Sequence, residues 1–144
     1  MFIVNIFLNI LIIIFSVLMM EIIAIFTHKY IMHGPGWALH KSHHEKHNNL
    51  FELNDIYAIF FSFPSAYLII YGLINAAYYL FSIGFGMLIY GLIYFFIHDI
   101  IVHKRVKSKF KLNSLYINNI RKAHLIHHSS KKKDNAKNFG FISY

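Results

Sequence analysis

Histidine is the residue type in this chain best suited to chemistry, because the sequence holds 11 histidines and ten of them fall into four short motifs. Two motifs have the spacing HxxxxH and two have the spacing HxxHH. Their members are His28 and His33; His40, His43 and His44; His98 and His103; and His124, His127 and His128. Imidazole is the commonest metal-binding side chain in proteins. Ten imidazoles are too many for one ion, so we predict two metal ions, each with an open position for a reactant.

The spacing within each motif indicates how the imidazoles could converge. Positions i, i+3 and i+4 of an α-helix share a face, so HxxHH is expected to direct three imidazoles to nearly one side. HxxxxH places two imidazoles about 140° apart on an α-helix, at heights from which both can reach a point beside it. A single histidine at a membrane surface is usually an interfacial residue, but four ordered motifs favour metal binding. His47 lies outside the pattern and is predicted to be a surface residue or to support a ligand residue.

Acidic residues near the motifs are candidates for orienting the imidazoles by hydrogen bonds. Glu21 precedes the first HxxxxH motif on the same helical face, and Asp99 lies within the second. Asp55 and Glu52 precede the second apolar segment. An ionisable group at membrane depth needs a partner, so we predict that Glu21 bonds to a ligand imidazole. The alternatives are a lipid-facing acid at Glu21, and helix capping by Asn54 or Asp55.

Three long apolar segments surround the motifs, over about residues 2–26, 56–74 and 76–97. A helix needs roughly 20 residues to cross about 30 Å of hydrocarbon, so each segment is predicted to span a membrane. Residues 112–128 are predicted to form a further amphipathic or short membrane helix. We therefore predict an all-α integral membrane bundle of three to four transmembrane helices with a cytoplasmic, histidine-rich helical cap. Residues 1–144 are expected to form one membrane-embedded domain.

The composition excludes several classes of protein. Hydrophobic residues make up 57% of the chain and charged residues only 14%, well below the roughly 25% charge of soluble domains. The absence of cysteine excludes disulfides, thiolate metal sites and iron–sulfur clusters. A net charge of +8 could indicate nucleic acid or anionic lipid as a partner. In so apolar a chain we expect a lipid membrane and no nucleic acid.

The basic residues predict the orientation in the membrane, because cytoplasmic loops are enriched in Lys and Arg. Of 14 basic residues, three lie within residues 28–55 and 11 lie from residue 104 onward. With three spans, these two segments lie on the same side. We therefore predict that the basic residues and the metal site face the cytoplasm, in a bacterial-type cytoplasmic membrane.

The sequence around the histidine motifs resembles the β-carotene hydroxylase family, within the membrane fatty acid hydroxylase superfamily. The histidine motifs by themselves indicate only the superfamily. The flanking stretches favour the carotenoid branch: His33-Gly34-Pro35-Gly36-Trp37, Phe51-Glu52-Leu53-Asn54-Asp55 and Phe139-Gly140-Phe141. The likeness covers residues 21 to 141, which is nearly the whole chain.

The resemblance implies a non-haem di-iron monooxygenase that hydroxylates carbon 3 of the β-ionone rings of β-carotene, giving β-cryptoxanthin and then zeaxanthin. It implies that the ten motif histidines ligate two iron ions, that O2 is the co-substrate and that a ferredoxin-type donor supplies electrons. The carotenoid would enter from the bilayer. Zinc could replace iron in a purified sample without altering the ligands.

Two alternatives remain open from the residues. A related histidine-rich di-metal hydroxylase, desaturase or ketolase could act on another lipid, such as a sterol, a fatty acyl chain or another carotenoid. A membrane metal-binding or transport protein without catalysis would need polar groups along its spans to pass an ion. Beyond Asn5, Asn9 and Glu21 the spans offer little of this kind, which disfavours the second alternative.

Overall fold

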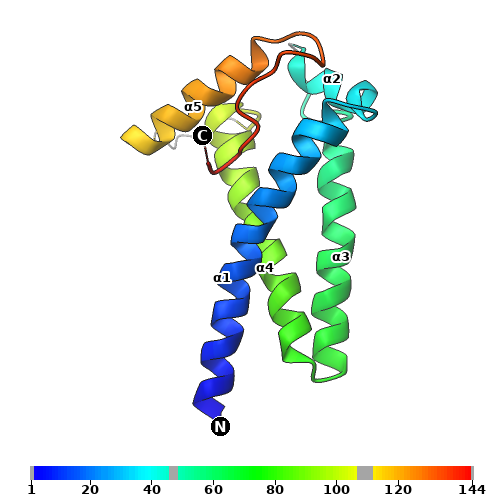
Figure 1. The fold of residues 1–144 in the computed structure, drawn as a ribbon, viewed down its shortest axis with the longest axis vertical. Coiled ribbons are helices and arrows are strands. Elements are labelled where there is room, and N and C mark those ends of the chain that lie inside the picture. The colour runs from blue at the N-terminus through cyan, green and yellow to red at the C-terminus, as the bar shows by residue number, and fades with distance from the viewer. Residues whose placement is uncertain (1, 46–48, 107–111, 144) are drawn as a thin grey trace. The chain divides into compact units, whose positions relative to one another are not determined.

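The structure is a computed structural model and describes residues 2–45, 49–106 and 112–143, with side chains from residue 5 onward. Within these ranges the chain forms helices, turns and loops and contains no β-strand, which confirms the predicted all-α class. The helices (Figure 1) are α1 Phe2–Phe26, η1 Thr27–Met32, α2 Trp37–His44, α3 Asp55–Ile74, α4 Tyr78–Tyr94, η2 Phe95–Val102 and α5 Leu115–His128. The segments η1 and η2 are π-helical. His47, with its predicted role, lies outside the described residues.

Three helical stretches are long and apolar enough to cross a membrane, which confirms the three predicted spans. They are Asn5–Met32, Asp55–Ile74 and Tyr78–Val102. Much of their apolar surface points outward: the side chains of Phe7, Phe60 and Phe63 are 62%, 72% and 72% exposed. Apolar exposure of this extent suits helices that are surrounded by lipid.

The chain groups into two compact units. The apolar unit consists of residues 1–20 and 57–93, and the histidine unit consists of residues 21–56 and 94–144. The apolar unit holds most of the length of the three spans, and the histidine unit holds all ten motif histidines. A single domain over residues 1–144 stays a prediction.

In the apolar unit, α3 and α4 form a helical hairpin with a tight turn (Figure 1). The turn has Ala76 in the left-handed region, with φ of 53°. The backbone N–H of Ala77 donates to the carbonyl of Gly72 at 2.9 Å, which closes the end of α3. This connection predicts that α3 and α4 cross a membrane in opposite directions.

Small residues on α4 let neighbouring helices of the apolar unit approach closely. A Cβ atom at Gly86 would lie 2.6 Å from the Cβ of Ser16, and one at Gly84 would lie 2.8 Å from the carbonyl oxygen of Ser65. The Ser65 hydroxyl donates to the Gly84 carbonyl at 2.9 Å. Close backbone approach and interhelical hydrogen bonds are the main sources of helix association in lipid, where the hydrophobic effect contributes little.

The histidine unit is built from shorter elements. A turn over residues 33–36 separates η1 from α2, with the N–H of Trp37 donating to the Gly34 carbonyl at 3.2 Å. At the start of α5, the Ser114 hydroxyl accepts from the N–H of Ile117 at 3.2 Å and caps the helix. This helix lies within the predicted 112–128 range and buries one face, which holds Ile117, Ile120, His124 and His127. That α5 is an amphipathic or short membrane helix stays a prediction.

Candidate metal centre

Each HxxxxH motif begins in a π-helical segment and ends at the residue that follows it, in place of the α-helix expected from the sequence. The N–H of His33 donates to the His28 carbonyl at 3.0 Å, and the N–H of His103 donates to the His98 carbonyl at 2.9 Å. This i→i−5 bonding sets residues five apart one wide turn from each other, so their side chains share a side of the helix. The ring centroids lie 5.3 Å apart in η1 and 4.5 Å apart in η2. The prediction of two imidazoles about 140° apart is therefore wrong, because it assumed an α-helix and the π-helical turn brings both rings to one side.

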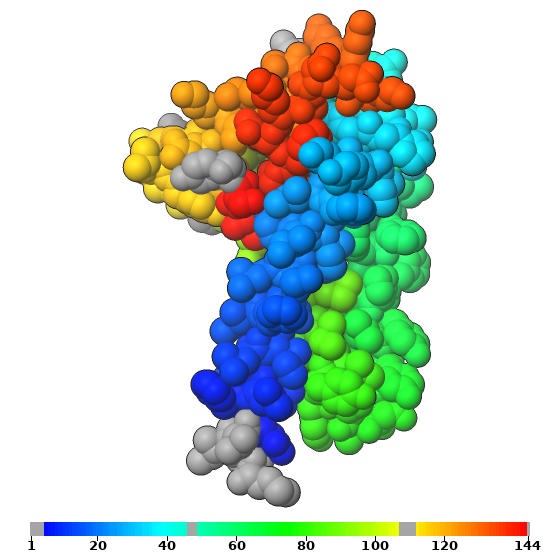
Figure 2. Space-filling view, viewed as in Figure 1, coloured from blue at the N-terminus to red at the C-terminus, as the bar shows by residue number. Residues whose placement is uncertain are grey.

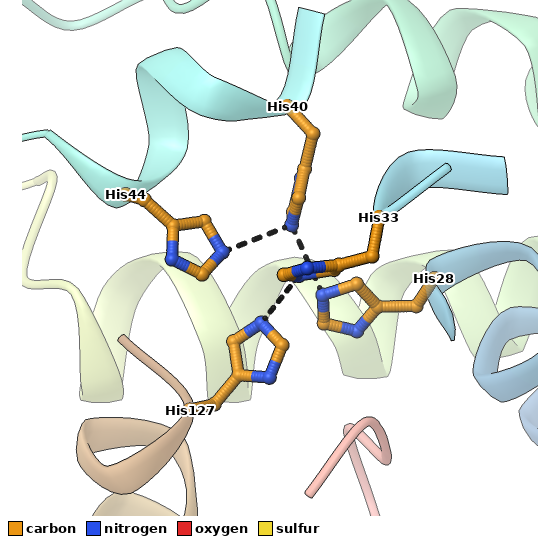
Figure 3. A group of neighbouring side chains, drawn as sticks. All are labelled: His28, His33, His40, His44 and His127. Atoms are coloured by element: carbon orange, nitrogen blue, oxygen red, sulfur yellow. Dashed lines mark hydrogen bonds between the residues drawn. The ribbon is translucent and has the colours of Figure 1, made fainter. Parts of the chain in front are cut away.

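Five buried histidines form the first group (Figure 3): His28, His33, His40, His44 and His127. One ring nitrogen from each lies within 4.8 Å of the corresponding nitrogens of the others. The dashed lines in Figure 3 mark Nε2–Nε2 separations of 3.1 Å for His28–His40, 3.1 Å for His33–His127 and 3.2 Å for His40–His44. The rings therefore converge on one point from η1, α2 and α5.

Four histidines form the second group: His43, His98, His103 and His124. The Nε2 atoms of His43 and His98 lie 3.1 Å apart, and those of His103 and His124 lie 2.6 Å apart. The ring centroid of His128 lies 4.4 Å from that of His124 and 4.6 Å from that of His43. Its Nε2 is buried and has no hydrogen-bond partner among the residues that the structure describes.

Each group draws on both halves of the sequence. On α2, His40 and His44 join the first group and His43 joins the second; on α5, His124 joins the second group and His127 the first. The three imidazoles of α2 lie near one another, with ring centroids 5.5 Å apart for His40 and His43, but they are divided between the two groups. Residues i and i+4 stay together, while i+3 belongs to the neighbouring group. By the same rule, the last histidine of α5 belongs on the side of the second group.

The outward-facing nitrogen of each first-group ring donates a hydrogen bond. The Nδ1 atoms of His28, His33, His44 and His127 donate to the carbonyls of Phe139 (3.0 Å), Lys133 (2.9 Å), Ser130 (2.8 Å) and Lys137 (2.9 Å), and that of His40 donates to Asn54 Oδ1 (2.7 Å). A carbonyl oxygen only accepts, so Nδ1 carries the hydrogen and Nε2 presents a lone pair to the centre.

Inward lone pairs at these separations fit a bound metal ion. Two Nε2 lone pairs 3.1 Å apart repel each other unless a cation attracts both. Metal–nitrogen bonds of about 2.0–2.1 Å place neighbouring ligand atoms about 3 Å apart, in agreement with this spacing. The buried, unpartnered Nε2 of His128 suits the same role, since buried polar atoms otherwise find a partner. The residues therefore fit two metal ions, although imidazole accepts zinc, copper or iron.

Burial keeps these imidazoles in the form that binds metal. Removal from water lowers the pKa of His40 to about 3, that of His44 to about 4 and that of His127 to about 3. Each pKa is far below the ordinary value of 6.5. The rings are therefore neutral at physiological pH, as metal ligation requires.

Carboxylates orient two histidines of the second group. His43 Nδ1 donates to Glu52 Oε2 at 3.0 Å, and His98 Nδ1 donates to Asp99 Oδ1 at 2.7 Å. The Arg105 guanidinium donates to both oxygens of Asp55, at 2.9 and 2.7 Å, and lies 3.4 Å from Glu52 and 3.4 Å from Asp99. These hydrogen bonds to Asp55 raise the pKa of Arg105. Of the predicted carboxylates, Asp99 therefore accepts directly from a motif histidine. Asp55 instead accepts from Arg105, which lies between it and the other two carboxylates.

Glu21 holds the end of the chain. Its Oε1 accepts from the backbone N–H groups of Phe141, Ile142 and Ser143, at 3.0, 3.0 and 2.8 Å. The Phe141 ring stacks on His28, with centroids 5.0 Å apart and planes 11° apart. In Figure 2 this red segment lies beside the blue and light-blue residues that follow Glu21. The predicted bond from Glu21 to a ligand imidazole stays a prediction.

Sequence reasoning missed several partners of the histidines. The sequence predicts Asn54 as a helix cap or part of a flanking family stretch, not as the acceptor for His40. It predicts Arg105 only as a cytoplasmic charge, not as the cation between the carboxylates behind His43 and His98. A signal for Arg105 in the sequence is its place two residues after His103. The backbone carbonyls of residues 130–139 have no sequence signal, since every residue has one.

Comparison with known proteins agrees with this geometry. Residues 13–144 match the sequence profile of the family described as fatty acid hydroxylase. The chain belongs to the fatty acid hydroxylase family. No solved structure gives a significant match to it.

The relatives of this fatty acid hydroxylase family member include several carotenoid enzymes. It is 42% identical over 135 residues to a β-carotene hydroxylase of a Paracoccus species, covering 93% of this chain and 83% of that protein. It is 43% identical over 134 residues to a β-carotene hydroxylase of Pseudescherichia vulneris, covering 93% of this chain and 76% of that protein. A chloroplastic β-carotene 3-hydroxylase of Arabidopsis thaliana is 36% identical over 117 residues, covering 79% of this chain and 39% of that protein. The predicted resemblance is confirmed.

Proposed function

We propose that this protein is a membrane di-iron monooxygenase that hydroxylates carbon 3 of the β-ionone rings of β-carotene. The observation that carries the proposal is a pair of buried, converging histidine groups in a chain 42% identical to a β-carotene hydroxylase. The first hydroxylation would give β-cryptoxanthin and the second would give zeaxanthin.

The ten motif histidines would hold the two iron ions, with His128 completing the second group. When bound, the ions supply the activation of O2 and the insertion of one of its oxygen atoms into a carbon–hydrogen bond. The chain supplies neutral imidazoles whose Nδ1 hydrogen bonds fix the tautomer that turns Nε2 inward. It offers no thiolate ligand, because the sequence has no cysteine.

The membrane setting suits the proposed substrate. β-Carotene is a long hydrocarbon that dissolves in the bilayer, and the apolar spans would bring the reaction to it. Electrons would come from an outside donor, because the sequence lacks the cysteine that an iron–sulfur centre of its own would need. We propose a reduced ferredoxin-type donor, to which the exposed Lys131-Lys132-Lys133 run would be electrostatically complementary.

The proposal is tested in bacteria engineered to accumulate β-carotene. Expression of the chain should convert β-carotene into β-cryptoxanthin and zeaxanthin, identified by chromatography and mass spectrometry. The His40→Ala variant, expressed to the same level, should leave β-carotene intact. Unchanged β-carotene with the natural chain would contradict the proposal, and ring ketones or hydroxylated sterols would identify the alternative substrate.

A purified assay tests the cofactor and donor. The protein in detergent, supplied with β-carotene, O2 and reduced ferredoxin, should form zeaxanthin in proportion to its iron content, measured by metal analysis of the same sample. Equal turnover in zinc-loaded protein would exclude iron chemistry.

A further inference from the structure

We propose that the two metal ions of this centre are inequivalent, because neutral groups orient the first histidine group and a carboxylate cluster around Arg105 orients two histidines of the second, His43 and His98. The inference rests on the proposed function in one respect, namely that both groups hold a metal ion. It deepens that function by stating which ion is held more tightly and which residues cause the difference.

Every acceptor for the first group is uncharged. Four of its Nδ1 atoms donate to peptide carbonyls of residues 130–139, and the fifth, on His40, donates to the amide oxygen of Asn54 at 2.7 Å. These acceptors fix the ring tautomer and add no negative charge. The ion of this group would therefore be held by neutral imidazoles whose acceptors do not compensate its positive charge.

The second group has charged acceptors in a buried setting. The Glu52 side chain, which accepts from His43 at 3.0 Å, is only 3% exposed. The Asp99 side chain, which accepts from His98 at 2.7 Å, is 11% exposed. Both belong to a cluster of three carboxylates, with Asp55, that surrounds the single guanidinium of Arg105. Three carboxylates and one guanidinium leave a net negative charge beside the second group.

This difference changes the ligands. A hydrogen bond to a carboxylate is stronger than one to a neutral carbonyl and leaves more electron density on the inward nitrogen. A negative charge in a poorly screened site also stabilises a nearby cation directly. The second ion should therefore bind more tightly, and its oxidised state should be favoured over that of the first ion.

Arg105 is a positioning residue in this arrangement. Its guanidinium, 12% exposed, holds Asp55 by two hydrogen bonds and keeps Glu52 and Asp99 within 3.4 Å. It touches none of the proposed ligand nitrogens. Its loss would release the carboxylates from their places behind His43 and His98.

The test is a calorimetric titration of Zn²⁺ into the full-length, metal-free protein in detergent. We expect each chain to bind one Zn²⁺ at a tight site and one at a weak site. Glu52→Gln and Asp99→Asn should each weaken binding at the tight site by about 10–100-fold and leave the weak site unchanged. Circular dichroism of each variant checks that the helices are intact.

Asn54→Asp is the matched variant on the first group. It keeps the shape of the side chain and puts a carboxylate behind His40, so it should tighten binding at the weak site by about tenfold. A gain in affinity cannot come from misfolding.

The outcomes separate this inference from the proposed function. Two sites of equal affinity would overturn this inference and leave the proposed function standing. The same would follow if Glu52→Gln and Asn54→Asp each changed the affinity of both sites to the same extent. Unequal sites that respond as described support it, even if cells show no hydroxylated carotenoid, a result that would overturn only the substrate. A chain that binds no Zn²⁺ would overturn both.

Discussion

The two nitrogens of each first-group imidazole have different roles. Nδ1 donates outward to a carbonyl or amide oxygen, and Nε2 faces the other rings at about 3 Å, a spacing typical of ligands around one metal. The outward bond decides the tautomer, so each of these rings presents a defined lone pair to the centre. Replacing a first-group histidine therefore removes an inward lone pair and also leaves a carbonyl or amide oxygen without its donor.

His128 provides the clearest test of ligand number. We expect His128→Ala to reduce bound metal from two ions to one per chain and to lower turnover by more than about 100-fold. Losing the hydrogen-bond partner of a ligand costs about 10–100-fold in metal affinity or activity, and losing the ligand itself should cost more. Metal analysis and carotenoid chromatography measure the two effects. Leu125→Ala on the same helix is the control, since Leu125 is 63% exposed. A His128→Ala protein that keeps both ions would remove it from the ligand set.

The metal-free protein should lose stability in mild acid. His40 and His127 have a pKa of about 3 in the folded protein and an ordinary value of 6.5, so the unfolded chain binds more protons between these values. Stability therefore falls as the pH drops below about 6.5 and recovers above it. Thermal unfolding of the metal-free protein at pH 7.5 and pH 5 measures this, and His40→Asn should reduce the slope. A melting temperature that rises on acidification would contradict the conclusion that His40 and His127 are neutral in the folded protein.

Helix packing in the apolar unit depends on small residues at defined places on α4. Gly86→Ala should destabilise the protein by about 1–3 kcal/mol, because the added Cβ would lie 2.6 Å from Ser16 Cβ and 2.8 Å from the Ile13 carbonyl oxygen. Gly91→Ala on the same helix is the control, since no described atom would lie within 4 Å of its Cβ. Alanine is also the better helix former by up to about 1 kcal/mol. Thermal unfolding in detergent compares the two, and equal stability of both variants would reject close packing at Gly86.

The order of the three spans leads to an orientation that labelling can check. The turn between α3 and α4 should face the outside, and the segment after α5 should face the cytoplasm with the basic residues. Because the sequence has no cysteine, Asn75→Cys and Lys132→Cys each introduce a single exposed thiol. An impermeant thiol reagent added to intact cells should label Asn75→Cys alone. Labelling of Lys132→Cys in intact cells would reverse the topology.

The histidine unit as a whole should depend on its ions. Removing them leaves buried imidazole lone pairs facing one another at about 3 Å, so the metal-free protein should be less stable. An ion present at 100 times its dissociation constant adds about 2.7 kcal/mol. Thermal unfolding with and without a chelator measures the change, and activity should return with added Fe²⁺. Identical unfolding of the two samples would show that the groups do not hold metal.

Much of this molecule follows from local pattern. Spans of the observed length, the helix that ends at His128 and the pairing of HxxxxH with HxxHH all follow from composition and spacing, because apolar length and residue type act locally. The histidine motifs indicate the hydroxylase superfamily, and the flanking stretches around His33, Asn54 and Phe139 indicate its carotenoid branch. Asp99 was identifiable as a partner because it adjoins His98 in the chain.

Tertiary structure decided how the histidines are shared. The sequence could not show that His43 leaves its neighbours on α2 for the other group, or that η1 and η2 widen into π-turns, because both depend on contacts between segments far apart in the chain. It could not show that Phe139 and Lys137 offer carbonyls to His28 and His127, since backbone groups carry no residue label. Residue types and their spacing determine which atoms are available to a metal, and long-range packing determines which of those atoms meet.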